Sequence, residues 1–167
     1  MASILNVDKI RATGSTTDGL TVNSSGQVAQ PALPFAMVTN TSGATVTPQT
    51  TVPFNNVISS RGISWDTSAY TFTVPVTGIY SFSGALRVQA TRDFLWWGVA
   101  DNSGNHLQTQ KLVLAHGSSG NFTTASGSIL ASLTAATNYK IIFNDSGGGS
   151  SVAITVNQTW MDVHLVG

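Results

Sequence analysis

The stretch FNNVISSRGISWDTSAYTFTVPVTGIYSFSGALRV, from Phe54 to Val88, decides how this chain folds. Its second half alternates large apolar residues with small or polar ones, first over 70–74 and then over 79–88. Pro75 and Gly78 interrupt the pattern between these two runs. Alternation with a period of two, bounded by Pro and Gly, is typical of half-buried antiparallel strands. The stretch therefore predicts a pair of strands joined by a turn.

The chain after residue 35 repeats this pattern of short runs separated by turn residues, and it shows no helical periodicity. Short strands at regular spacing favour a sandwich or a jelly roll. The predicted strands are residues 35–38, 52–58, 70–74, 78–88, 94–101, 106–114, 121–133, 139–144 and 153–166. We therefore expect an all-β fold of antiparallel strands, a sandwich or a jelly roll, with an extended N-terminal arm.

The arm, residues 1–30, differs in composition from the head, residues 31–167. It contains no aromatic residue, and its short apolar runs alternate with turns such as Asp18-Gly19. Such a segment cannot build its own core, so it is either disordered or buries its apolar residues against another surface. Because these residues recur at strand spacing, attachment is favoured. The expected attachment residues are Ile4, Leu5, Val7, Ile10, Leu20 and Val22.

The composition narrows the possible partners of the protein. The formal net charge is +0, only 8% of the residues are charged, and there is no cysteine. A neutral chain lacks the basic surface of a nucleic-acid-binding protein and the basic stripe of a membrane-surface helix. No apolar run reaches the ~20 residues of a membrane span, and no secretory signal pattern is visible at the start. We expect a soluble protein with no nucleic acid or membrane as its partner.

No catalytic, metal or cofactor site is expected. The histidines do not cluster in the sequence, and the seven aspartates are dispersed without an evident acid–base pair. The glycine-rich segment 145–151 lacks the lysine and the following helix of a phosphate-binding loop. Asp101, Asn102 and Asn105 are the best candidates for a calcium site, but these residue types are also typical of a hairpin turn, which we favour.

The run 94–99 is apolar on both faces of its predicted strand. Either a loop of the same chain covers its outer face, or one face fills the core and the other packs on neighbouring subunits. Aromatic residues are enriched at subunit interfaces, which favours the second interpretation. The predicted subunit-interface residues are Phe94, Leu95, Trp96, Trp97 and Val99.

The head resembles the complement component-1q-like globular domain, a member of the tumour necrosis factor-like jelly rolls. The family pattern is Phe-x-x-Val, an aromatic followed by Asp, and Phe-Thr-x-Pro-x-x-Gly-x-Tyr-x-Phe. The residues that match it are Phe54, Val57, Trp65, Asp66, Phe72, Thr73, Pro75, Gly78, Tyr80 and Phe82. The likeness extends over 35–167 and implies a homotrimer around a three-fold axis. Met161 and Asp162 replace small residues of the family, which leaves the packing of the last strand open.

The arm segments ILNVDKI (4–10) and TTDGLTVNSSGQV (16–28) resemble N-terminal attachment regions of structural proteins of tailed phages. This resemblance implies a non-enzymatic trimeric decoration or cement protein, made in the host cytoplasm, that binds the major capsid protein at the outer capsid surface of the virion. The alternative is the receptor-binding head of a short tail or head fibre. Its candidate contacts with a host glycan or protein are Trp65, Asn121, Asn144 and the glycine-rich loop.

Overall fold

The computed structural model describes residues 8–10, 19–30, 33–107, 114–115, 122–146 and 149–166. The chain divides into two compact units, residues 1–33 and residues 34–167. In the described part of the chain, the regular structure consists of β-strands, and each strand pairing is antiparallel. The expected all-β fold class is therefore confirmed. No helix in the described ranges is long and apolar enough to cross a membrane.

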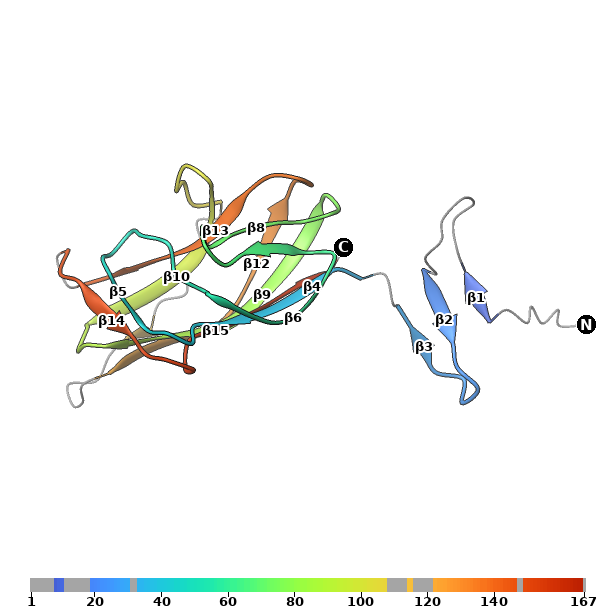
Figure 1. Ribbon diagram of the computed structural model, residues 1–167, viewed down its shortest axis with the longest axis horizontal. Coiled ribbons are helices and arrows are strands. Elements are labelled where there is room, and N and C mark those ends of the chain that lie inside the picture. The colour runs from blue at the N-terminus through green and yellow to red at the C-terminus, as the bar shows by residue number, and fades with distance from the viewer. Residues whose placement is uncertain are drawn as a thin grey trace, which may run out of the picture. The chain divides into compact units, whose positions relative to one another are not determined.

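The N-terminal unit contains a small antiparallel sheet (Figure 1). Its strands are β1 (Lys9–Ile10), β2 (Leu20–Val22) and β3 (Val28–Ala29), in that order across the sheet. Asn23 shapes the turn between β2 and β3, because its Oδ1 accepts hydrogen bonds from the backbone N–H groups of Ser25 and Gln27 at 3.0 and 2.9 Å. Gly26 has a φ of 76°, which glycine adopts without strain.

The head contains two sheets that lie face to face (Figure 1). The strands of the five-stranded sheet, in spatial order, are β11 (Leu114–Ala115), β10 (Phe94–Asp101), β13 (Tyr139–Asp145), β8 (Thr71–Thr73) and β7 (Ser64–Asp66). We call it the β10 sheet.

The second sheet is seven-stranded, and we call it the β9 sheet. Its strands, in spatial order, are β5 (Ala44–Val46), β14 (Val152–Ile154), β9 (Gly78–Gln89), β15 (Trp160–Leu165), β4 (Phe35–Thr39) and β6 (Asn56–Arg61), with β12 (Thr123–Leu133) paired to β9. β12 pairs with β9 from Gly78 to Val88, on the side of β9 opposite β15.

An aromatic cluster joins the two sheets through the core. The ring centroids of Phe72 in β8 and Phe82 in β9 are 5.8 Å apart. Trp65 stacks on Phe72 at 5.0 Å, and Tyr139 lies 5.9 Å from Phe72. Burial of each such side chain contributes about 1.5–3 kcal/mol to stability. The alternation predicted for 79–88 is confirmed, because Tyr80 and Phe82 are fully buried while Ile79 on the opposite face is 45% exposed.

The predicted strands differ from the structure at several places. β5 and β7 are not predicted, and the strand predicted over 52–58 begins at Asn56, because Val52 and Phe54 pack into the core before the strand starts. The strand predicted over 153–166 is two strands, since the chain turns between β14 and β15. The buried Thr159 stabilises this turn, its Oγ1 accepting a hydrogen bond from the Arg87 backbone N–H at 3.1 Å. Most of 106–114 lies outside the described residues.

Met161, which left the packing of the last strand open, lies opposite Gly84 in the pairing of β15 with β9. A Cβ atom at position 84 would lie 2.6 Å from the backbone oxygen of Trp160 and 2.9 Å from Cε of Met161. Real Cβ atoms do not approach other atoms so closely. The large Met161 side chain is therefore accommodated because Gly84 has no side chain.

We predict that Gly84→Ala destabilises the head by about 1–3 kcal/mol, because the added methyl group overpacks the contact with Met161. Urea unfolding of the purified protein measures the change. The control is Ser60→Ala at an exposed position of β6, which should change stability by no more than about 0.5 kcal/mol. Equal unfolding midpoints for the two variants would contradict the packing argument.

Candidate functional site

Strand β10 carries the predicted trimer-interface residues, and the structure divides them between its two faces. Leu95, Trp97 and Val99 are 0% exposed and belong to the core cluster. Their position does not support contact with another subunit, because side chains without exposed area offer no surface to a partner. Phe94 is 39% exposed.

Trp96 lies on the opposite face of β10 but is only 6% exposed. The ring of His106 covers it, with the two centroids 4.7 Å apart and the planes inclined by 59°. Gly98 leaves room for this histidine, since a Cβ there would lie 3.2 Å from Nδ1 of His106. Because His106 of the same chain covers Trp96, an apolar residue on this face of β10 does not require a partner subunit. A trimer contact at β10 stays a prediction, with Phe94 as its exposed residue.

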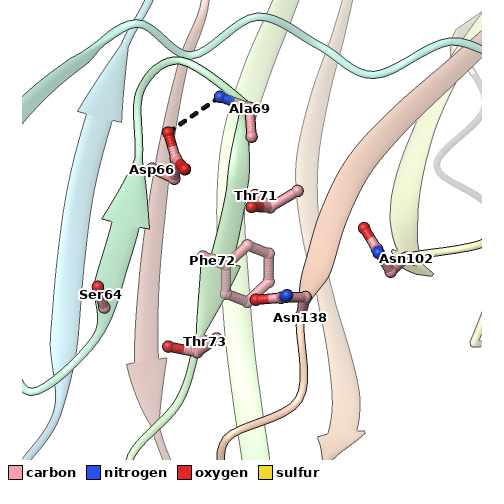
Figure 2. A pocket seen from close by; sticks show the side chains of 8 residues that line it. All are labelled: Ser64, Asp66, Ala69, Thr71, Phe72, Thr73, Asn102 and Asn138. Carbon is pink, nitrogen blue, oxygen red and sulfur yellow. Dashed lines mark hydrogen bonds between the residues drawn. The ribbon is translucent and has the colours of Figure 1, made fainter.

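The outer face of the β10 sheet has two polar hollows. The first, which we call the Asp66 hollow, has a volume of about 410 Å³ (Figure 2). Its polar lining residues are Ser64, Asp66, Thr71, Thr73, Asn102 and Asn138. The second, the Lys140 hollow, has a volume of about 420 Å³. The lining residues that matter below are Gln49, Trp96, His106, Lys140, Ile142 and Asn144.

Asp66 is an exposed carboxylate at the edge of its hollow. Its Oδ1 accepts hydrogen bonds from the backbone N–H groups of Ala69 and Ser68, at 2.9 and 2.8 Å, and Figure 2 shows the first of them. These bonds, with Ala69 first, lower the pKa of Asp66 below its ordinary value. The side chain is therefore a fixed anion that can accept hydrogen bonds from a ligand.

Lys140 is held beside the hairpin that follows β10, where its Nζ donates a hydrogen bond to the backbone oxygen of Asn102 at 2.9 Å. In the same hairpin, both carboxylate oxygens of Asp101 accept hydrogen bonds of 2.9 Å from Asn105. The side-chain bond from Asn105 is the main reason why the pKa of Asp101 is lowered. This arrangement is that of a hairpin turn, and no group of three His, Cys, Asp or Glu residues converges in the described part of the chain.

The remaining sequence candidates fall in different places. Asn144 lines the Lys140 hollow, whereas Trp65 packs in the core region and donates from Nε1 to the backbone oxygen of Phe54 at 3.2 Å. His106 and His164 lie on different sheets. His116, Asn121 and residues 147–148 of the glycine-rich loop lie outside the described residues.

The outer face of the β9 sheet combines small central residues with exposed apolar ones. Ser83 pairs with Ser128 on one side and with Asp162 on the other, and Asp162 pairs with Met37. We call this surface the β9-sheet outer face. Its exposed apolar residues are Met37 (40%), Ile79 (45%), Leu130 (60%) and Trp160 (40%). Sequence reasoning missed this surface because each strand contributes only an isolated apolar residue to it.

Asp162 lies within this face, two residues from His164 along β15. Partial burial raises the pKa of Asp162 above its ordinary value, and the attraction of His164 offsets this in part. Further desolvation of this carboxylate costs free energy. A partner that covered this face would therefore raise the pKa of Asp162 further.

The N-terminal unit also exposes apolar residues on one face of its sheet. Ile10 pairs with Leu20, and Val22 pairs with Val28, so these residues share a face. Ile10, Val22 and Val28 are 54%, 38% and 64% exposed. We call these residues the arm face. Val28 was not predicted, and the predicted Ile4, Leu5 and Val7 lie outside the described residues.

Comparisons with known proteins address the fold of the head. Among solved structures, Eiger TNF from S. frugiperda is 8% identical with a TM-score of 0.61, covering 81% of this chain and 94% of that chain. Murine APRIL is 9% identical with a TM-score of 0.59, covering 80% and 99%. The globular domain of zebrafish complement 1qA is 16% identical with a TM-score of 0.55, covering 80% and 98%. At these identities the similarity shows the fold alone.

A search of the curated proteins found no match to this sequence. The family model of the C1q domain matches residues 35–146, which is more than half of the chain. This match agrees with the resemblance carried by the motif from Phe54 to Phe82, and with the antiparallel sheets built around β9. The chain belongs to the C1q domain family, and its head has the jelly-roll fold that C1q domains share with tumour necrosis factor-like proteins.

Proposed function

We propose that this chain is the protomer of a non-enzymatic homotrimeric decoration protein of a tailed-phage virion. In this proposal the head trimerises through the β9-sheet outer face, and the arm face binds the major capsid protein at the outer capsid surface and so stabilises the shell. The observation that carries the attachment role is the arm face, where Ile10, Val22 and Val28 are exposed on one side of a small sheet.

The arm face fits attachment because, among the described residues of its unit, no second layer covers this small sheet of short strands. Apolar side chains on one face are stabilised when another surface removes them from water. Each arm needs to bind only weakly, since three arms linked in one trimer raise the effective affinity together.

The β9-sheet outer face fits a subunit contact better than β10 does. Small side chains at its centre, such as Ser83 and Ser128, allow a second copy to approach closely, while Leu130 and Trp160 supply apolar area. Burial of one such apolar side chain contributes about 1.5–3 kcal/mol. We therefore place the trimer contact here rather than at the Phe94–Val99 run. The buried residues of that run pack within their own chain.

The receptor-binding head of a short fibre is the alternative, and the two polar hollows on the β10 sheet favour it. The two roles differ in what the arm binds. A fibre head is carried by its arm and contacts the host through the β-sandwich, whereas a decoration protein contacts the capsid through the arm.

We predict that Val28→Asp weakens binding to capsids stripped of the protein by at least about tenfold, because a charge on the arm face must be desolvated on contact. Co-sedimentation of the full chain with such capsids measures this. The matched control is Thr21→Asp, on the opposite face of the same sheet, which should bind like the parent. Binding of the parent to host cells and not to capsids would contradict the decoration role and favour the fibre head.

We predict that Leu130→Asp converts the trimer into a folded monomer, as measured by size-exclusion chromatography with light scattering. The control Val76→Asp changes an apolar residue of similar exposure, 48% against 60%, outside the strands and should leave the trimer intact. Phe94→Asp tests the contact at β10. If Phe94→Asp gives the monomer and Leu130→Asp does not, the trimer contact lies at β10.

We predict opposite pH effects on stability for Asp162→Asn and Asp66→Asn. Because the folded-state pKa of Asp162 is raised, its carboxylate destabilises the fold at neutral pH, and this effect vanishes as the pH falls below the ordinary value of 3.8. Because the pKa of Asp66 is lowered, its carboxylate stabilises the fold above 3.8 and loses this effect as the pH falls through the lowered value.

Thermal unfolding at a series of pH values measures both effects. At neutral pH, Asp162→Asn should melt above the parent and Asp66→Asn below it, and both differences should shrink in acid. A stabilisation by Asp162→Asn that persists unchanged in acid would show that the desolvated charge is not its cause.

A further inference from the structure

We propose that the outer face of the β10 sheet binds an acidic oligosaccharide across the two hollows. A carboxylate on one sugar lies at Lys140, and the hydroxyl groups of a neighbouring sugar lie in the Asp66 hollow. This activity goes beyond the decoration role and does not depend on where the arm attaches.

The two hollows share a border, so one extended ligand can occupy both. Thr71, which lines the Asp66 hollow, is paired with Lys140, which lines the other. Asn102 also lines the Asp66 hollow, and its backbone oxygen accepts the hydrogen bond from Lys140. The volumes of about 410 and 420 Å³ are each in the usual range of ligand pockets, roughly 300–1,000 Å³.

The Lys140 hollow has the chemistry to hold a sugar carboxylate. An ammonium group has three N–H donors, and the bond to Asn102 uses one of them, so Lys140 keeps donors for an anion. No carboxylate is present among the described residues that line this hollow. Gln49 and Asn144 add amide donors and acceptors for ring hydroxyls. A charge-assisted hydrogen bond to the ammonium is about twice as strong as a neutral one.

Two apolar side chains, Trp96 and Ile142, lie at the base of the Lys140 hollow. They are only 6% and 2% exposed, so the polar residues of the lining present most of the area that a ligand would contact. His106 packs against Trp96 and forms part of the wall. Lys140, Gln49 and Asn144 therefore supply the contacts that would define the ligand in this hollow.

The Asp66 hollow supplies hydrogen-bond partners for uncharged hydroxyl groups. Figure 2 shows Asp66, Thr71, Thr73 and Asn138 around the same space, from β7, β8 and the residue before β13. The Asp66 carboxylate accepts from hydroxyls, the threonine hydroxyls both donate and accept, and the amide does both as well. A fixed anion here repels carboxylates, so a sugar carboxylate is placed at Lys140. The neighbouring sugar lies in the Asp66 hollow with its hydroxyl groups inward and its own carboxylate toward solvent.

Other ligand classes fit these hollows less well. Nucleic acid binding requires several cations along a phosphate backbone, whereas this chain has a net charge of +0 and the hollows contain a single lysine among their described lining residues. Peptides are recognised through an exposed strand edge, an apolar groove or an arginine cluster. Closely spaced hydroxyl, amide and carboxylate groups beside one ammonium group fit the hydroxyls and the carboxylate of an acidic sugar better.

The experiment titrates the full-length protein with alginate oligomers, which carry a carboxylate on each sugar, and with neutral dextran oligomers of equal length, by isothermal calorimetry. We expect binding of alginate and at least about tenfold weaker binding of dextran. Lys140→Met should weaken alginate binding by about tenfold at an unchanged melting temperature. The matched control Lys9→Met, which removes the same charge from the N-terminal unit, should bind like the parent.

Backbone and side-chain amide NMR signals locate the ligand. We expect shifts at Asn138, Lys140 and Asn144 on addition of alginate. If neither oligomer bound, the proposal would be overturned. The decoration role would still stand or fall on the capsid experiment with Val28→Asp. Equal binding of alginate and dextran would overturn the assignment of Lys140. If polyaspartate or oligothymidylate bound as tightly as alginate, the site would recognise negative charge and not a sugar. This result would also overturn the proposal.

Discussion

The contact of Phe72 with Phe82 across the core is the constraint on which the rest of the head depends. These residues belong to different sheets, and Trp65 and Tyr139 pack around Phe72 in the same layer. Because side chains alternate along a strand, directing Phe72 inward directs Thr71 and Thr73 outward. In the same way, burial of Phe82 directs Ser81 and Ser83 to the other surface. Both outer faces of the head are thus set by which residues fill the core.

Much of this arrangement could be predicted from the sequence, because the period of a strand reports its buried face directly. The predicted strand over 78–88 matches β9, and the strand over 94–101 matches β10. The resemblance carried by the motif from Phe54 to Phe82 added the jelly-roll architecture and is supported by the family match. Between β14 and β15, no Gly or Pro marks the turn in residues 155–159, and the prediction of a single strand over 153–166 was wrong.

The candidate sites were less predictable, because they are built by residues far apart in the sequence. An apolar strand face has the same pattern whether its own chain or a partner covers it, so the burial of Trp96 by His106 could not be distinguished from a trimer contact. The β9-sheet outer face takes Met37, Leu130 and Trp160 from different strands. The border between the hollows depends on the bond from Lys140 to Asn102, which spans 38 residues. The ion pair between Nε of Arg92 and Oδ2 of Asp145, at 2.6 Å, joins residues that are 53 positions apart in the sequence.

The turn at Asn23 has a consequence for how the arm meets its partner. Its side chain fixes the register of β2 and β3, and a slip of one residue would move Val22 and Val28 to opposite faces of the small sheet. A hairpin whose register is set by its own hydrogen bonds presents its apolar side before any encounter. The conformational entropy of ordering these strands is then lost during folding and not during binding, which is the physical meaning of a preorganised contact.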